Sequence, residues 1–244
     1  MTTTHPRPYA EDGGSVTRPV AVAIPAYQAE ASVGDVVRRC LAQLPQVLVI
    51  DDGSDDGTAA AAREAGAEVI SFEVNRGKGD ALETAFAELF GRGCSAVVTV
   101  DADGQHLPEE IPVLLAAAAG ADQVLGTRDH LFAQMSPLRR ASNRLSSRAI
   151  ALVAGRPLTD IQTGFRLYSK RLIERVGFPE PRFEAESAVV VRAARAGLAI
   201  VGVPVRLGFA DGRTTSHFRP LVDSLRIAGA VTRARFERRR RAAA

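Results

Sequence analysis

The chain has 244 residues, of which 46% are hydrophobic, 24% charged and only 5% aromatic, and it contains no tryptophan. This composition is typical of one large globular domain and excludes a disordered or fibrous protein. The net charge of +3 is unevenly distributed, because residues 233–241 hold six arginines and one glutamate and therefore leave −2 for the rest of the chain.

Strands and helices alternate along the predicted order of elements. Short apolar runs predict strands at 20–24, 47–50, 68–71, 96–100 and 123–125, and the amphipathic stretches between them predict helices at 29–44, 58–65, 79–90 and 108–119. The second half is less regular, with helices predicted at 136–154, 184–196 and 218–241 and strands at 165–168 and 200–205. This alternation predicts an α/β fold in which helices cover both faces of a mainly parallel sheet.

One domain is expected over residues 19–220. Residues 1–18 predict a flexible segment without the apolar core of a secretory signal, and residues 221–244 predict a basic amphipathic helix and tail. No window approaches about 18 consecutive apolar residues, so we expect no membrane span and a cytoplasmic location. Cys40 and Cys94 lack the spacing of a metal site or disulfide framework and are expected to be buried apolar side chains.

The most informative motif is Asp101-Ala102-Asp103-Gly104-Gln105-His106, which directly follows a predicted strand. In an open parallel sheet the carboxyl ends of the strands meet at one edge, and ligands bind there. Two carboxylates at this edge, helped by a nearby amide oxygen, suit a hard cation such as Mg²⁺ or Mn²⁺. The alternative is a solvated turn, and His106 is open between a site residue and a polar residue that precedes a helix.

Two further polar clusters follow other strands. The segment from Asp51 to Thr58 permits a tight turn whose carboxylates accept hydrogen bonds from a base or ribose, or alternatively an Asx-turn near a helix cap. The segment Asn75-Arg76-Gly77-Lys78-Gly79 is a glycine-rich turn with two cations that suits an anion. Together the clusters describe a site for an activated nucleotide, bound through base, ribose and a metal-bridged diphosphate.

These motifs resemble, in order and spacing, those of the GT-A glycosyltransferases of family 2. The resemblance covers residues 19–220 and is strongest to polyprenyl-phosphate (dolichyl-phosphate) mannosyl- and glucosyltransferases. It extends through Pro25-Ala26-Tyr27, Gly126-Thr127-Arg128, Asp160-Ile161-Gln162-Thr163-Gly164-Phe165-Arg166, Phe183-Glu184-Ala185-Glu186 and Ser216-His217-Phe218. It implies a nucleotide-binding sheet with a less regular acceptor-side half, and inverting, metal-dependent transfer of a sugar from a UDP- or GDP-sugar, with a polyprenyl phosphate at the membrane as the favoured acceptor.

The resemblance also assigns roles to individual residues. It implies that Pro25, Tyr27, Glu30, Asp52, Ser54, Lys78, Asp101 and Ala102 bind the nucleotide, and that Asp101, Asp103 and Gln105 hold Mg²⁺ or Mn²⁺. It implies that Arg128, Arg213, His217, Gln162 and Glu184 contact phosphates or the acceptor, and that Asp160, Asp103 and Arg128 are catalytic. Asp160 is the candidate base if the acceptor is a hydroxyl, whereas an ionised lipid phosphate needs none. A structural cap or salt bridge is the alternative role of Asp160.

The basic C-terminal helix has two interpretations. Its stripe of Leu221, Leu225, Ala228 and Val231 either packs on the domain and ends in a solvated tail, or binds an anionic membrane surface as an interfacial helix. The second interpretation implies a peripheral location on the inner face of the membrane. The acidic body makes nucleic acid a poor partner.

Other functions remain as alternatives. A glycosyltransferase of this fold acting on a hydroxyl of a glycan, lipid or small molecule is the first. A sugar-nucleotide nucleotidyltransferase is disfavoured because Pro25-Ala26-Tyr27 replaces the glycine-rich basic loop expected after its first strand. A non-catalytic nucleotide-sugar-binding protein is disfavoured by the intact set Asp101, Asp103 and Gln105.

Overall fold

The computed structural model describes residues 19–128, 147, 150–155, 158, 160–208 and 220–237. The strands are β1 (Val20–Ala26), β2 (Val47–Asp51), β3 (Glu68–Ser71), β4 (Ala96–Thr99), β5 (Gln123–Thr127), β6 (Arg166–Ser169) and β7 (Ile200–Pro204). The helices are α1 (Glu30–Leu41), α2 (Thr58–Glu64), α3 (Lys78–Gly91), the short 3₁₀ helix η1 (Pro108–Glu110), α4 (Ile111–Ala117), α6 (Lys170–Val176), α7 (Glu184–Arg195) and α8 (Pro220–Phe236).

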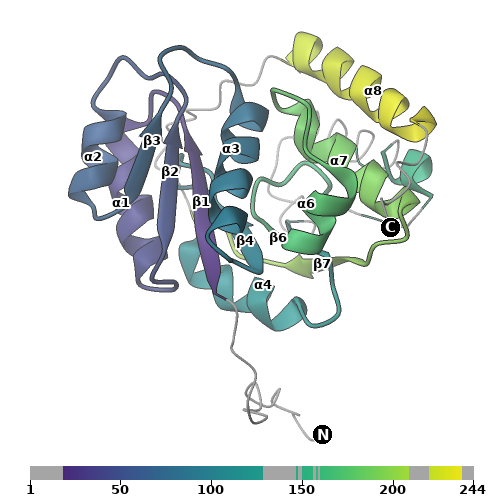
Figure 1. Ribbon diagram of the computed structural model, residues 1–244, viewed down its shortest axis with the longest axis horizontal. Coiled ribbons are helices and arrows are strands. Elements are labelled where there is room, and N and C mark those ends of the chain that lie inside the picture. The colour runs from purple at the N-terminus through teal and green to yellow at the C-terminus, as the bar shows by residue number, and fades with distance from the viewer. Residues whose placement is uncertain are drawn as a thin grey trace, which may run out of the picture.

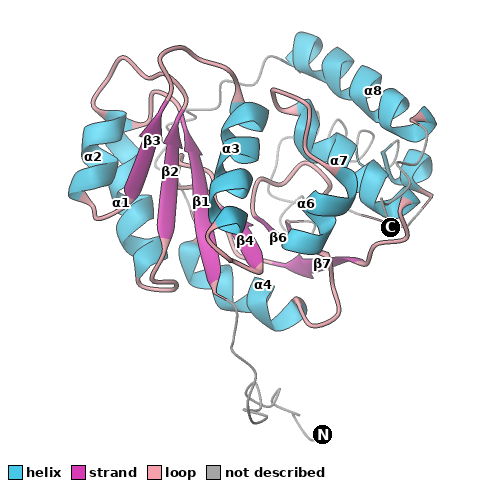
Figure 2. Ribbon diagram, in the orientation of Figure 1, coloured by secondary structure: helices cyan, strands magenta, loops and turns pink. Residues whose placement is uncertain are grey.

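The strands form one sheet in the order β3-β2-β1-β4-β6-β5-β7, and helices lie on both of its faces (Figures 1 and 2). Strand β6 runs antiparallel to β4 and β5, and the other neighbouring strands are parallel. The predicted α/β class with a mainly parallel sheet is therefore confirmed. The carboxyl ends of β1, β2 and β4 share one edge, as the parallel order requires.

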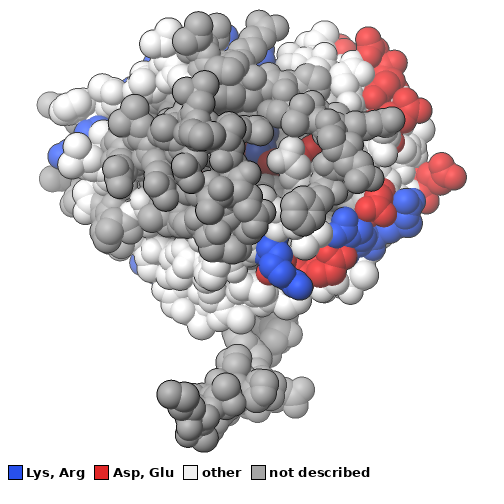
Figure 3. All heavy atoms as spheres, turned by 180° about the vertical axis from the view of Figure 1, so that it is seen from behind, with Lys and Arg blue, Asp and Glu red and all other residues white. Residues whose placement is uncertain are grey.

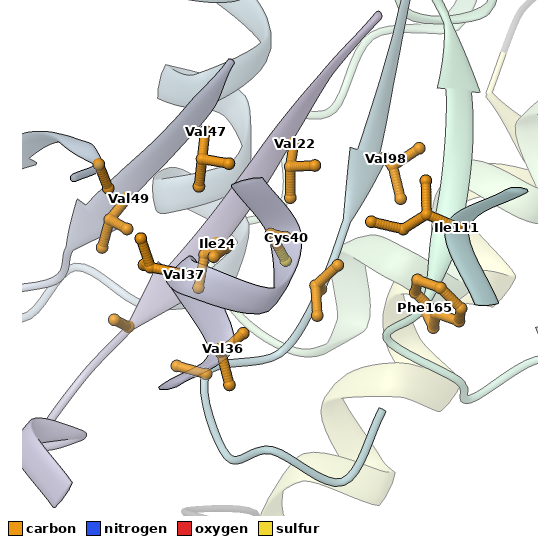
Figure 4. Close-up of a cluster of buried hydrophobic side chains, with 14 of the residues drawn as sticks. Val22, Ile24, Val36, Val37, Cys40, Val47, Val49, Val98, Ile111 and Phe165 are labelled. Carbon is orange, nitrogen blue, oxygen red and sulfur yellow. The ribbon is translucent and has the colours of Figure 1, made fainter. Parts of the chain in front are cut away.

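Both faces of the central strands are buried. Val22 and Ile24 of β1 face α1, where Val36, Val37 and Cys40 pack against them (Figure 4). The alternate residues Ala21 and Ala23 face the opposite layer, which α3, α6 and α7 supply with Leu82, Phe86, Leu172 and Val189. This double burial explains why the strands appear in the sequence as continuous apolar runs. Cys40 and Cys94 are free and buried, as predicted.

The structure differs from the prediction at three places. β1 continues through Pro25 to Ala26, because the β1–β4 ladder has already ended and the missing N–H of the proline removes no ladder bond. Helix α6 follows β6 directly and was not predicted. The helix predicted at 136–154 lies largely outside the described residues, of which 147 and 150–154 are helical.

Charge on the rear of the molecule is mixed. In the view from behind, described basic and acidic side chains lie side by side along one edge (Figure 3). Among the described ion pairs, Arg39 pairs with Glu109 and Arg206 with Glu110. None of the helices in the described ranges combines the length and the apolar character that crossing a bilayer requires.

Candidate active site at the carboxyl ends of the strands

A cleft of about 520 Å³ opens where β1 and β4 end. It joins three of the clusters that the sequence singled out, namely residues 25–29, 75–78 and 101–103. The opposite wall comes from the second half of the chain, through the segment before α7 and the first turns of α8. The lining residues are Pro25, Tyr27, Gln28, Ala29, Asn75, Gly77, Lys78, Asp101, Ala102, Asp103, Arg182, Phe183, Asp223 and Arg226.

The carboxylate of Asp52 supports the floor of this cleft. Its Oδ1 accepts the backbone N–H of Arg76 at 2.7 Å, and its Oδ2 accepts that of Gly77 at 2.8 Å. Burial raises the pKa of Asp52, and the two hydrogen bonds oppose the rise. Asp52 therefore orders the loop that leads into α3.

The two glycines of this loop are required by packing. A Cβ atom on Gly77 would lie 2.5 Å from the carbonyl oxygen of Pro181, and one on Gly79 only 1.9 Å from that of Glu180. Gly77 also has a φ of +106°, which favours glycine. The glycines let residues 180–182 approach the start of α3, and Asp80 donates its N–H to the Pro181 carbonyl at 3.1 Å.

The acidic loop after β2 accepts hydrogen bonds from the backbone that leads into helix α1. Ser54 Oγ accepts the N–H of Gln28 at 3.0 Å, and Thr58 Oγ1 accepts that of Ala29 at 2.7 Å. Asp56 accepts the N–H of Glu30 at 3.2 Å and that of Thr58 at 3.0 Å, which is an Asx-turn. The Asx-turn alternative is thus observed at Asp56, whereas the N-cap residue of the following helix α2, Gly57, has no side-chain cap hydrogen bond.

The two carboxylates of the Asp-x-Asp motif differ in environment. Asp101 Oδ1 lies 2.7 Å from Lys78 Nζ, whereas Asp103 lines the cleft and accepts the N–H of Gln105 at 2.9 Å. Burial would raise the pKa of Asp101, but the charges of Lys78, His106 and Arg128 outweigh it and hold that pKa below its ordinary value. Burial and the Asp101 carboxylate together raise the pKa of Asp103.

A cation fits beside Asp103. Hard divalent cations bind carboxylate oxygens and complete their coordination shell with water and phosphate. Asp103 offers a carboxylate in the cleft, and the negative charge of Asp101 makes ionisation of that carboxylate less favourable in the absence of a cation. Within the described ranges no three His, Cys, Asp or Glu side chains form a group that would hold a metal. The protein donors available there are therefore Asp101 and Asp103, with the side chain of Gln105 half-buried nearby in sequence.

His106 lies behind the cleft. Its ring is buried and stacks on Phe165 with 5.5 Å between ring centroids, and its Nδ1 has no hydrogen-bond partner among the described residues. Burial lowers the pKa of His106 to about 4, so the ring is neutral near pH 7.

A buried network of charges ties Lys78 to the second half of the chain. Lys78 Nζ lies 2.9 Å from Glu186 Oε2 as well as close to Asp101, and these two carboxylates raise the pKa of Lys78 against the effect of burial. Arg166 is fully buried and donates to the carbonyls of Ile161, Thr163 and Glu186 at 2.7, 2.6 and 2.6 Å. Arg166 belongs to the Asp160–Arg166 motif but was assigned no role from the sequence, although an arginine inside a predicted strand was a signal.

Arg128 and Asp160 form a closed pair. The backbone N–H and the Nε of Arg128 donate to Asp160 Oδ2 at 2.7 and 2.8 Å, and its Nη2 donates to Oδ1 at 2.8 Å. Asp160 is 1% exposed and has a φ of +43°. Burial would lower the pKa of Arg128, but the hydrogen bonds to Asp160 and the charge of its carboxylate outweigh this effect and raise that pKa above its ordinary value. The carboxylates of Asp101 and Asp103 also interact electrostatically with Arg128, so the pair lies near the Asp-x-Asp motif.

The remaining predicted residues are placed as follows. Glu30 is exposed at the start of α1, and Gln162 is half-buried. Glu184 is buried beside a separate hollow of about 360 Å³ between α7 and α8, and its Oε2 has no partner among the described residues. Arg213 and His217 lie outside the described residues. Arg182, Phe183, Asp223 and Arg226, which line the cleft, were not predicted.

The fold is that of the GT-A glycosyltransferases. A crystal structure of glucosyl-3-phosphoglycerate synthase from Mycobacterium tuberculosis, in complex with phosphoglyceric acid, superposes with a TM-score of 0.70 over 89% of this chain and 80% of that chain, at 22% identity. A structure of the same enzyme with Mn²⁺, UDP and phosphoglyceric acid gives 0.68 over 91% and 80%, also at 22% identity.

The sequence places the chain more closely. Residues 21–177 match the profile described as Glycosyl transferase family 2, and the chain belongs to that family. The undecaprenyl-phosphate mannosyltransferase of Micrococcus luteus is 32% identical over 199 residues, which are 76% of this chain and 82% of the relative. The undecaprenyl-phosphate 4-deoxy-4-formamido-L-arabinose transferase of Enterobacter sp. (strain 638) is 33% identical over 168 residues and 64% of this chain, which spans only 50% of that relative's length. The protein is thus a glycosyltransferase, as its motifs predicted.

Proposed function

We propose that the protein transfers a sugar, with inversion, from a UDP- or GDP-sugar to a polyprenyl phosphate, with Mg²⁺ or Mn²⁺ as cofactor. The observation that carries the proposal is the cleft, which brings the residues after β1, the loop before α3 and Asp101–Asp103 together around one space of about 520 Å³. Its size suits a small-molecule ligand. The acceptor is proposed from the relatives, whose names specify undecaprenyl phosphate.

The donor would lie along the wall formed by β1 and the loop before α3. Tyr27 offers a ring face for the base, and the Gly77 loop brings backbone close to the ligand. Arg182 adds a guanidinium to this wall, and within the described part of the chain it has no ion pair. Planar guanidinium groups bind phosphates with two parallel hydrogen bonds, so Arg182 suits the nucleotide's phosphates.

Asp101 and Asp103 would hold the cation. A divalent cation bound there offsets the negative charge that develops on the leaving diphosphate. Lys78 keeps the carboxylate of Asp101 ionised and fixed in place, because the two charged groups are only 2.7 Å apart. Asp103 is left to face the ligand.

The acceptor proposal agrees with the state of Asp160. Both of its carboxylate oxygens accept hydrogen bonds from Arg128, so we propose that Asp160 orients Arg128 and does not remove a proton. A hydroxyl acceptor would require a base, whereas an ionised phosphate attacks without one. The in-line displacement then depends mainly on positioning and on electrostatic stabilisation.

The test is a transfer assay with UDP-glucose and GDP-mannose, a short-chain polyprenyl phosphate and Mn²⁺, with the anomer of the product read by NMR. Asp103→Asn is expected to lower the rate by roughly 100-fold or more, since several kcal/mol of charge stabilisation is lost. Asp35→Asn on α1, whose side chain is 62% exposed, is the matched control and should retain activity. Full activity of Asp103→Asn, or a product that retains the donor's anomeric configuration, would reject the proposal.

A further inference from the structure

Helix α8 packs on the domain with one face only. Ile227, Ala230, Val231 and Ala234 are buried and belong to a hydrophobic cluster shared with α7, beside which α8 lies (Figure 1). Val231, which belongs to the apolar stripe that the sequence left open between packing and membrane binding, is therefore a packing residue. The packing interpretation holds for this inner face.

Ion pairs and hydrogen bonds fix the helix in this orientation. Arg192 of α7 contacts Glu237 through Nε at 2.7 Å and Glu180 through Nη1 at 2.7 Å. Arg195 Nη1 donates to the carbonyls of Ala234 and Glu237 at 2.6 and 2.9 Å. Because both arginines hold the end of α8, the opposite face of the helix is kept outward.

The outer face carries large apolar side chains in water. Leu225 is 75% exposed and Phe236 is 78% exposed. Eleven residues separate them, which puts them within about 20° of each other around the helix and roughly 16 Å apart along it. Ala228, Gly229 and Thr232 lie between them and are exposed as well. These five residues define the outer face of α8.

The charges around the outer face have one sign. Arg226 and Arg233 lie on one side of it and Arg235 on the other, and the sequence continues with Arg238 to Arg241. Of the acidic residues of this segment, Asp223 is buried and pairs with Arg226 at 3.3 Å, and Glu237 is engaged by Arg192. Among the described residues, Arg233 and Arg235 have no ion pair and carry the positive charge of this face. A helix with exposed leucine and phenylalanine between arginines is complementary to a bilayer that contains anionic lipid.

The same helix borders the cleft, because Asp223 and Arg226 line it. We infer that the outer face of α8 binds an anionic lipid bilayer and thereby sets the cleft beside the membrane surface. The membrane-binding surface is inferred from the exposed apolar side chains and the charges beside them. Only the entry of a lipid acceptor into the cleft from this membrane rests on the proposed function. A lipid acceptor would then enter at Arg226 without leaving the bilayer.

The experiment measures sedimentation of the full chain with vesicles of phosphatidylglycerol and phosphatidylcholine, and with vesicles of phosphatidylcholine alone. The variant is Leu225→Asp/Phe236→Asp. The matched control is Ala60→Asp/Ala87→Asp, which adds the same two charges at exposed positions of α2 and α3. We expect binding to the anionic vesicles to fall about tenfold or more in the α8 variant and to change by less than about threefold in the control, with weaker binding of the wild type in high salt.

Three outcomes would overturn the inference. The wild type does not bind anionic vesicles, or the α8 variant binds as well as the control, or gel filtration without lipid shows a dimer that the α8 variant alone dissociates, in which case a second copy covers the face. Activity on a short-chain acceptor in solution separates this inference from the proposed function. The α8 variant should retain that activity, and loss of transfer by every protein would refute the proposed function while vesicle binding still decided the inference.

Discussion

Replacing Gly79 by alanine is expected to push residues 180–182 away from the start of α3. The added Cβ would lie 1.9 Å from the carbonyl oxygen of Glu180, and restoring even 3.0 Å requires a displacement of at least 1.1 Å. Helix α3 cannot give way easily, because Leu82 and Phe86 are packed in the core. Residues 180–182 must therefore move, and the hydrogen bond from Asp80 to Pro181 weakens with them.

The expected cost follows from these two effects. Overpacking that shifts backbone costs about 1–3 kcal/mol, and a lost backbone hydrogen bond costs about 1 kcal/mol. The free energy of unfolding should thus fall by about 2–4 kcal/mol, measured by urea denaturation. Arg182 and Phe183 line the cleft within or next to the displaced segment. The affinity for UDP with Mn²⁺, measured by calorimetry, is therefore expected to fall about tenfold, or 1.4 kcal/mol.

Gly91→Ala provides the control on the same helix. Gly91 is the last residue of α3, has no positive φ, and a Cβ there would meet nothing within 4 Å. Alanine at such a position is expected to leave stability unchanged or to raise it by up to about 1 kcal/mol. If Gly79→Ala unfolded at the same urea concentration as wild type and bound UDP equally well, the close approach of residues 180–182 would not be the reason for the glycine.

Three more changes test the charged groups of the site. Glu186→Gln should lower the free energy of unfolding by about 2–4 kcal/mol, because it removes one charge of the buried Lys78–Glu186 pair. Glu184→Gln should leave stability nearly unchanged, because Oε2 of Glu184 lacks a partner among the described residues. Equal losses for the two variants in urea denaturation would contradict this reasoning. Burial lowers the pKa of His106 to about 4, below its ordinary value, so this contribution to stability is complete above about pH 6.5 and is lost as the pH falls toward 4. The loss of stability between pH 6.5 and pH 5 amounts to about 2 kcal/mol. His106→Gln should remove this part of the pH dependence of the free energy of unfolding. Asp160→Asn should lower kcat at every pH through misplacement of Arg128, and recovery of activity at high pH would instead indicate a base.

The sequence predicted the first half of the fold well because local and global signals agree there. β1, β2 and β4 are buried on both faces, so they appear as continuous apolar runs, and the helices between them are amphipathic. The reversal of β6 was not predictable in the same way. Its direction depends on the path of the chain between β5 and β6, and hydrophobic periodicity does not encode the direction of a strand.

The site was predictable where topology alone brings residues together. Asp101, Asp103 and Tyr27 follow parallel strands and meet at one edge for that reason. The far wall was not predictable, because Arg182 and Arg226 reach the cleft only through the packing of α7 and α8. Helical geometry also separates residues that the sequence groups. Glu184 and Glu186 are about 200° apart around α7, and only Glu186 reaches Lys78.

Most charged side chains of the site are engaged by other groups of the protein, including Asp101, which also lines the cleft. Asp52 is occupied by two backbone N–H groups, Asp160 by Arg128, and Asp101 by Lys78. Asp103 lacks such a cationic partner among the described residues, and the neighbouring Asp101 carboxylate raises its pKa. At the proposed cation site, a bound cation would therefore stabilise ionised Asp103 more than it stabilises the carboxylates of Asp52, Asp101 and Asp160. It follows that substitutions of Asp52 and Asp160 should lower stability, whereas Asp103→Asn should lower the transfer rate by roughly 100-fold or more and leave the free energy of unfolding almost unchanged.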